Sequence, residues 1–197
     1  MKPLLMVVFL LVQSCFSLVL AQTKQKMKWI VQPQVQVING NENVSSAVSL
    51  STGFLQNNHQ LTMGLGIDYY FFRTVPIQTT YQYYLGKKEN KPFVYVSLGY
   101  SVAWATQVQK YTDVRWGLWS SETTTAVYNN GYVYAFGLGY SLKMNRQHHL
   151  NFNIGYNVKT IHELYDEQVF NGTNTIQIPR KKEYILRRLA IGLSYQF

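Results

Sequence analysis

The stretch HLNFNIGYNVK, residues 149–159, decides how this chain folds, because its apolar residues recur at every second position. One alternating set is apolar and consists of Leu150, Phe152, Ile154, Tyr156 and Val158. The other set is small or polar and consists of Asn151, Asn153, Gly155, Asn157 and Lys159. Successive side chains of a β-strand point to opposite faces, so the stretch predicts a strand with one apolar and one polar face.

The same alternation recurs on both sides of this stretch, over most of the chain. Clear alternation occupies residues 61–71, 92–106, 132–142 and 183–197, and weaker alternation occupies residues 29–38, 47–55 and 75–85. Pro33 weakens the first of the weaker segments, since proline cannot donate a hydrogen bond to a neighbouring strand. No convincing apolar stripe with the helical period of 3.6 residues is found. The fold is therefore predicted to be all-β, with about eight strands.

The composition of the two faces indicates that the apolar face points outward. Small and amide residues oppose the large apolar ones, whereas the core of a soluble β-sandwich, about 10 Å thick, must be filled by bulky side chains. Lipid can surround the apolar face if the polar face lines a narrow interior. Charged residues make up only 14% of the chain, against the ~25% typical of soluble domains. These observations predict a transmembrane up-and-down antiparallel β-barrel.

The N-terminus has the pattern of an export signal. A basic residue precedes a long apolar run, and the sequence VLA at residues 19–21 fits a cleavage site. We therefore expect a signal peptide over residues 1–21 and a barrel domain over residues 22–197. The only cysteine, Cys15, lies within the signal, so the mature chain would hold no disulfide. An uncleaved membrane anchor and a lipid attached at Cys15 are the alternatives for this segment.

Connection lengths also match a membrane barrel, which has short periplasmic turns and longer external loops. Counting back from Phe197 at the periplasmic end, the short connections near residues 57–58, 86–91 and 143–148 fall on that side. The connections near residues 40–46, 107–130 and 166–182 fall outside, and two of them are the longest in the chain. Only the connection at residues 73–74 is short where a longer loop is expected.

Repeated glycine and aromatic pairs carry a resemblance to a known family. They are Gly64-Leu65-Gly66, Leu98-Gly99-Tyr100, Gly137-Leu138-Gly139-Tyr140 and Gly155-Tyr156, and Lys91-Pro92-Phe93-Val94 opens a strand. With these features the chain resembles the small outer-membrane β-barrels, namely the OmpX-like and OmpA-transmembrane-domain-like barrels, and particularly the short porin family barrels of Bacteroidota-type bacteria. The resemblance implies localisation in the bacterial outer membrane. It implies no particular activity, because a fold does not determine a function.

The end of the chain matches an assembly signal of that family. Leu193, Tyr195 and Phe197 place apolar side chains at alternate positions of a strand that closes on phenylalanine. This pattern is similar to the signal read by the barrel-assembly machinery. The resemblance therefore implies that machinery as a partner.

Three charged residues are predicted to face the interior of the barrel: Asp68, Lys159 and Arg188. Buried charges are tolerated only when they are paired. We therefore expect a lumen network of these three residues with the polar side chains Gln78, Gln82, Asn153 and Asn157. Since an eight-stranded barrel has an interior just wide enough for side chains, this network would plug the barrel. The alternative is a narrow polar path for small solutes.

The longest connection, residues 107–130, is the predicted place of external recognition. Its residues Tyr111, Arg115, Trp116 and Trp119 are candidates for a surface that binds an extracellular protein or another ligand. Loops carry function more often than the scaffold does. The alternative is a loop whose aromatic residues pack on one another.

No arrangement of residues predicts catalysis or a bound metal. His162 and Glu163 could supply a base, but the sequence shows no matched serine and histidine on a strand. His148 and His149 are adjacent and would point to opposite faces of a strand, so they do not predict a metal site. No cofactor is predicted, and the chain is expected not to be an enzyme.

The formal net charge of +9 lies mainly at predicted strand ends and turns. Basic residues there suit the phosphates of lipopolysaccharide and of other outer-membrane lipids. Export of the chain argues against nucleic acid as a partner. The simpler alternative is that these charges keep the ends of the barrel hydrated.

Aromatic residues are expected to form girdles at both membrane interfaces. The outer girdle is predicted to contain Tyr69, Phe71, Trp104, Tyr132 and Tyr134. The inner girdle is predicted to contain Tyr100, Tyr140, Tyr195 and Phe197.

The sequence thus favours a non-enzymatic outer-membrane β-barrel with a plugged lumen, which contributes to envelope integrity or surface interaction through its extracellular loops. A narrow porin-like channel for small solutes is the first alternative, and a lipid-modifying barrel enzyme is the second. A soluble lipocalin-like carrier fits less well, because the inward faces are small and polar and the chain closes on Phe197.

Overall fold

The computed structural model describes residues 27–40, 44–71, 73–86, 88–104, 114–117, 120–123, 127–144, 148–170 and 175–197. The predicted signal peptide lies outside these residues. No helix within them has the length and apolar character needed to cross a membrane.

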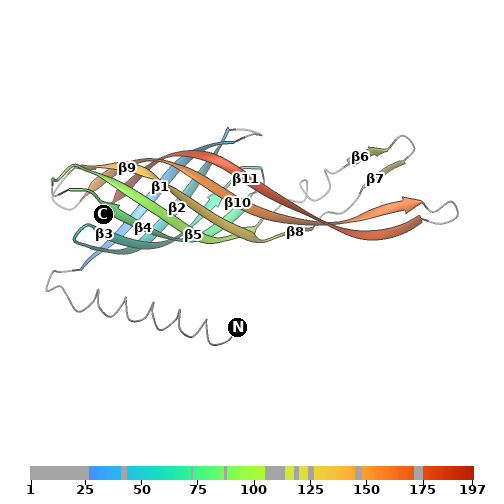
Figure 1. Ribbon diagram of the computed structural model, residues 1–197, viewed down its shortest axis with the longest axis horizontal. Helices are drawn as coiled ribbons and strands as arrows, with labels where there is room; N and C mark the ends of the chain where they lie inside the picture. The colour runs from blue at the N-terminus through green and yellow to red at the C-terminus, as the bar shows by residue number, and fades with distance from the viewer. Residues whose placement is uncertain are drawn as a thin grey trace, which may run out of the picture.

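Eight antiparallel strands close into a barrel (Figure 1). In chain order they are β1 (Lys28–Gly40), β2 (Val44–Gln56), β3 (His59–Asp68), β4 (Thr74–Tyr84), β5 (Lys91–Ala103), β9 (Gly131–Lys143), β10 (His149–Phe170) and β11 (Thr175–Gln196). Each strand pairs with the next in this order, and β1 pairs with β11, so the sheet closes on itself. The prediction of an all-β, up-and-down barrel of about eight strands is confirmed.

Three shorter strands belong to the long connection between β5 and β9. β6 (Val114–Gly117) and β7 (Ser120–Thr123) form a separate two-stranded sheet. β8 (Val127–Asn129) adds to the barrel wall by pairing with β10, where Asn129 lies opposite His162.

Side-chain exposure follows the predicted alternation. On β3, Met63 and Leu65 are each 61% exposed, whereas Gln60 and Thr62, which precede them on the other face, are buried. The large apolar side chains therefore point away from the barrel, and the polar ones point into its lumen. This arrangement is the reverse of a soluble core and is the one that a surrounding lipid phase stabilises.

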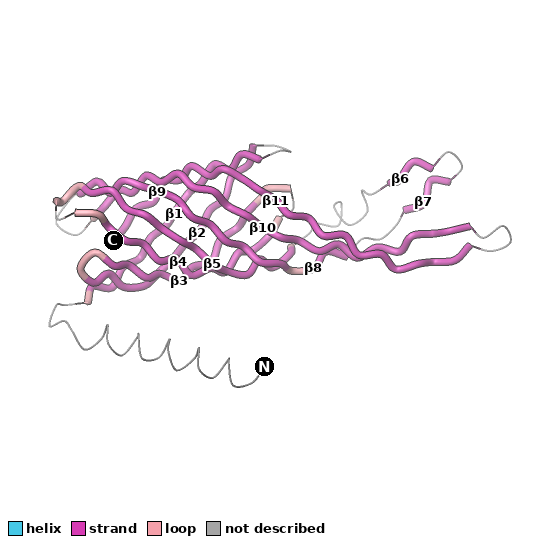
Figure 2. The backbone as a smooth tube through the Cα atoms, in the orientation of Figure 1, coloured by secondary structure: helices cyan, strands magenta, loops and turns pink. Residues whose placement is uncertain are grey.

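The two ends of the barrel differ in how far the strands extend, as Figure 2 shows. The turn end carries the connections near residues 57–58, 85–90 and 144–148 together with Phe197. The loop end is the opposite end, where β10 and β11 run past the rest of the barrel. The pairing of β1 with β11 stops at Gly40 and Arg188, but β10 and β11 remain paired as far as Phe170 and Thr175.

This extension corrects the prediction of an external connection over residues 166–182. Most of those residues are strand, and only residues 171–174 separate β10 from β11. Two strands that leave the barrel have neither a lumen side nor a lipid side, so their residues need not alternate. Pro179 and the three basic residues that follow it therefore concealed the strand.

Tyr100 was predicted for the inner girdle, but it lies in the outer one. Tyr100 is opposite Tyr132, with their ring centroids 5.7 Å apart, so it belongs to the loop end. The reason is the direction of β5, which begins at the turn end with Lys91 and finishes at the loop end with Ala103. Tyr100 therefore lies close to the strand's far end.

Glycines on the inward face make room for large aromatic rings that lie over the neighbouring strands. A Cβ atom added to Gly155 would lie 2.1 Å from the hydroxyl oxygen of Tyr95, and one added to Gly139 would lie 2.1 Å from the ring of Phe93. Real side chains cannot approach so closely, so these two positions require glycine. The lumen is filled by rings rather than left as a wide pore.

Candidate functional site

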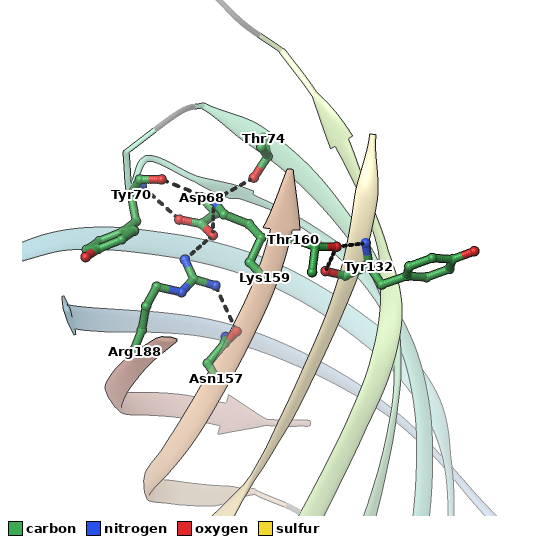
Figure 3. A network of polar contacts seen from close by, with 8 residues as sticks. All are labelled: Asp68, Tyr70, Thr74, Tyr132, Asn157, Lys159, Thr160 and Arg188. Carbon is green, nitrogen blue, oxygen red and sulfur yellow. Dashed lines mark hydrogen bonds and ion pairs between the residues drawn. The ribbon is translucent and has the colours of Figure 1, made fainter. Parts of the chain in front are cut away.

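The charged cluster, which we define as Asp68, Lys159 and Arg188, lies in the lumen near the loop end (Figure 3). The Lys159 Nζ atom is 2.9 Å from Asp68 Oδ2, and the Arg188 Nη1 atom is 2.6 Å from the same oxygen. All three residues are buried, with exposures of 3% or less. The structure therefore brings the three predicted charges together from β3, β10 and β11.

One carboxylate cannot neutralise two cations. Lys159 and Arg188 therefore also donate hydrogen bonds to neutral groups. Lys159 Nζ also donates to the carbonyl oxygen of Tyr70 at 3.1 Å and to the hydroxyl of Thr74 at 3.2 Å. Arg188 Nη2 donates to Asn157 Oδ1 at 2.8 Å. These hydrogen bonds offset part of the high cost of removing the ions from water, and Arg188 Nε is left without a hydrogen-bond partner among the described residues.

The short connection between β3 and β4 closes the loop end over this cluster. The backbone N–H of Tyr70 donates to Asp68 Oδ1 at 2.8 Å, which is the turn-forming contact that aspartate favours. Phe71 then adopts a positive φ of 62°, and the Tyr70 side chain is left 2% exposed. The Arg188 guanidinium lies 5.3 Å from the centre of the Tyr70 ring. This unusually short outer connection thus places a ring against the charged cluster.

A second network without charges fills the lumen at the turn end. We call it the amide network and define it as Gln32, Gln60, Tyr84, Ser194 and Gln196. The Tyr84 hydroxyl donates to Gln60 Oε1 at 2.7 Å, Gln60 Nε2 donates to Gln32 Oε1 at 2.8 Å, and Gln32 Nε2 donates to Ser194 Oγ at 2.6 Å. The Tyr84 hydroxyl is also 3.3 Å from Gln196 Oε1. The network joins β1, β3, β4 and β11 and is buried throughout.

Two small cavities lie in the lumen between the two networks, among the residues that the structure describes. One of about 30 Å³ is lined mainly by polar side chains, and one of about 20 Å³ lies beside Asp68 and Arg188. Cavities of this size have room for about one or two water molecules. Asn153 Oδ1 borders the larger cavity and has no hydrogen-bond partner within the described part of the protein.

The four polar residues predicted to join the charged cluster are divided between these regions. Asn157 contacts Arg188 directly. Gln82 lies at the turn end, 3.3 Å from the Tyr84 hydroxyl. Gln78 and Asn153 line the larger cavity.

Sequence reasoning missed the amide network and the contribution of Tyr70. Glutamines at alternate positions of β1, beginning with Gln32, mark an inward polar face. Their partners on other strands depend on the register between strands. Alternation within a single strand does not determine that register.

The predicted loop-binding residues lie largely beyond what the structure describes. Tyr111 and Trp119 fall outside the described residues. Arg115 and Trp116 lie on β6, opposite Glu122 and Ser121 of β7 in the backbone register. A binding surface on this connection stays a prediction.

The residues considered for catalysis lie at the loop end, whereas His148 and His149, which were considered for metal binding, lie at the turn end where β10 begins. Glu163 is buried on β10, and its Oε2 atom accepts a hydrogen bond from the Tyr184 hydroxyl at 2.6 Å. His162 is adjacent and faces the other side of the strand. Among the described residues, no three histidine, cysteine, aspartate or glutamate side chains are grouped so that they could hold a metal ion.

The residues of the predicted assembly signal lie along the outer face of β11 at the turn end. Leu193 is 45% exposed and Phe197 is 50% exposed. The rings of Tyr195 and Phe197 meet edge to face at 4.9 Å, and the N–H of Phe197 donates to the carbonyl oxygen of Val31 at 3.0 Å. Their role in assembly stays a prediction.

Comparison with known proteins supports the fold. No family model and no curated protein matches the sequence. The structure is similar to Neisserial surface protein A, with a TM-score of 0.58 and 10% identity over 87% of this chain and 98% of that one. It is also similar to the outer membrane protein OprG from Pseudomonas aeruginosa, with a TM-score of 0.52 and 10% identity over 89% of this chain and 98% of that one. The chain therefore has the fold of the small outer-membrane β-barrels.

Proposed function

We propose that this protein is a non-enzymatic barrel of the bacterial outer membrane whose lumen is plugged, and that it contributes to envelope integrity or surface interaction through its loop end. The observation that supports this most directly is the closure of the lumen at both ends. The charged cluster fills one end, the amide network fills the other, and the cavities between them measure about 30 and 20 Å³.

The dimensions of the barrel favour a plug over a channel. Eight strands enclose an interior that side chains can fill completely. Here the large inward side chains include Tyr84, Phe93, Lys159 and Arg188, each less than 3% exposed. A conducting path would require several of them to move together.

The loop end is the part that would meet other molecules. β10 carries its last residues, and β11 its first residues, beyond the barrel (Figure 2). Arg180, Lys181 and Lys182 are exposed on this extension. Three neighbouring cations suit the phosphates of lipopolysaccharide or an acidic patch on an extracellular protein. At the turn end, Leu193, Tyr195 and Phe197 would be read by the barrel-assembly machinery.

Planar-bilayer conductance of the detergent-extracted protein tests the plugged lumen. We expect no steady conductance from the wild-type protein and none from Arg188→Ala, because the amide network still closes the turn end. Leu50→Ala, at a lipid-facing position that is 54% exposed, is the matched control. Folding of each protein is checked by the shift between unheated and heated bands on a gel.

Steady, ion-selective steps from the wild-type protein that change in Arg188→Ala would contradict the proposal. Transport of small solutes would then be the function to pursue.

A further inference from the structure

Two shallow apolar grooves run side by side over the outer faces of β9 and β10. Leu138 and Ile154 lie opposite each other and form the ridge that both grooves share. The far wall of the first groove contains Phe136 and Tyr156, and that of the second contains Tyr140 and Phe152. Their volumes are about 450 and 390 Å³. We call them the paired grooves.

The paired grooves have the spacing of side-chain rows on a strand. Rows two residues apart along a strand are ~7 Å apart, so each groove is one side chain wide. The walls are exposed apolar residues, and Leu138 and Ile154 are 61% and 53% exposed. Two narrow, parallel, apolar grooves match two hydrocarbon chains that lie next to each other.

A cation lies next to the first groove on the side of the loop end. Leu189 of β11 lines that groove, and the next outward-facing residue of β11 is Arg187, which is exposed. Arg187 lies opposite Val158, which in turn lies opposite Tyr134. Tyr134 is 43% exposed and belongs to the aromatic residues of the loop end, which mark the depth of lipid headgroups.

The outward face of β11 continues beyond Arg187 with more charge. Ile185 comes next and is 55% exposed, and Glu183 and Lys181 follow it and are also exposed, so the charges of this face are two cations and one acid. A guanidinium at headgroup depth binds phosphate well, because it can donate two parallel charge-assisted hydrogen bonds. Arg187 lies one row of side chains beyond the wall of the first groove, and an apolar surface flanked by such a cation fits an anionic amphiphile.

We infer that the paired grooves and Arg187 bind a phosphorylated, multiply acylated glycolipid of the lipid A type. Two of its acyl chains lie in the grooves, and a phosphate contacts Arg187. This inference rests on the proposed placement in the outer membrane and adds a defined lipid site to it.

The opposite side of the barrel offers a matched surface without the cation. The outward residues of β2 and β3 are also mainly apolar, and Leu50 and Leu65 are 54% and 61% exposed. Neither strand contains a lysine or an arginine. A lipid that needs only apolar contact would therefore bind both sides, whereas a phosphorylated lipid would prefer the paired grooves.

Native mass spectrometry of the detergent-extracted protein tests this site. The probes are diphosphoryl lipid A, the same lipid without its phosphates, phosphatidylglycerol and inorganic phosphate. We expect one tightly retained diphosphoryl lipid A per barrel. Arg187→Gln should weaken its retention about tenfold, the loss expected for one charge-assisted contact of about 1.4 kcal/mol.

Two further variants separate the grooves from the cation. Ile154→Trp places a large ring over the shared ridge and should weaken retention of lipid A as well. Leu50→Trp on the other side of the barrel and Lys88→Gln at the turn end are the controls and should retain it fully.

Equal retention of lipid A by the wild type, Arg187→Gln and Ile154→Trp would overturn the inference. Equal retention of the lipid without phosphates, or a second copy of the protein in place of lipid, would overturn it too. A protein that shows no folded band in any lipid would instead overturn the proposed membrane function itself.

Discussion

The loop end of the lumen holds two buried cations around a single carboxylate, whereas the turn end holds amides and hydroxyls with no charge in their network. Both regions fill the same narrow interior, and both consist of side chains that are almost wholly buried. They differ in how the parts depend on one another. Lys159 and Arg188 share one oxygen of Asp68, but the amide network is a chain of separate pairwise hydrogen bonds.

This difference teaches which end is more sensitive to a single change. Removing one partner of a buried ion pair leaves an uncompensated charge, which costs far more than the pair itself contributed. A neutral hydrogen bond contributes less, and its loss leaves only one polar group unsatisfied. A single substitution should therefore destabilise the protein more at the loop end than at the turn end.

The largest expected effect is that of Asp68→Asn. The variant keeps the size of the side chain but leaves Lys159 and Arg188 buried without a counter-charge, so it should lower the free energy of unfolding by about 3–5 kcal/mol. Urea unfolding of the protein in lipid vesicles measures the change. The comparison would be contradicted if Asp68→Asn lowered the free energy of unfolding by less than Tyr84→Phe does.

A smaller effect is expected from Tyr84→Phe in the amide network. Loss of the hydroxyl leaves the side-chain oxygens of Gln60 and Gln196 without that donor, which should cost about 1–3 kcal/mol. The same urea experiment applies. Tyr132→Phe is the control, because Tyr132 is 67% exposed on the outer face and its hydroxyl should matter by less than about 0.5 kcal/mol.

The smallest change is expected when all three charges are replaced together. Asp68→Leu, Lys159→Met and Arg188→Met in one protein leave no unpaired ion, and apolar replacement of a buried ionic triad is often close to neutral. The unfolding free energy should stay much nearer the wild-type value than that of Asp68→Asn. A triple variant as unstable as the single one would show that packing, rather than charge, makes the loop end sensitive.

The barrel could be predicted from the sequence because alternation is a local property. The alternation within a strand identifies its apolar and its polar face, as in residues 149–159. The same alternation predicts that Asp68, Lys159 and Arg188 point inward. Pairing across the barrel is not local. Whether Gln82 meets Arg188 or Tyr84 depends on how far each strand is shifted against its neighbour, and one strand's pattern does not fix that shift.

The two other departures have causes of their own. Tyr100 lies near the loop end because β5 begins at the turn end with Lys91, a direction that the connections at residues 86–91 and 107–130 already indicate. Residues 166–182 lie beyond the barrel, where no lipid face imposes alternation, so the pattern that reveals the other strands is missing there.

The seam between β1 and β11 has a consequence for how fast the barrel can form. Gln32 and Ser194, joined at 2.6 Å, are 162 residues apart in the chain. Joining such distant segments requires closing a very long loop, and proteins dominated by contacts of this kind fold slowly. Until the last strand arrives, the sheet keeps two open edges that can pair wrongly. Folding should therefore be limited by ring closure, and a chain shortened before β11 should aggregate rather than form a smaller barrel.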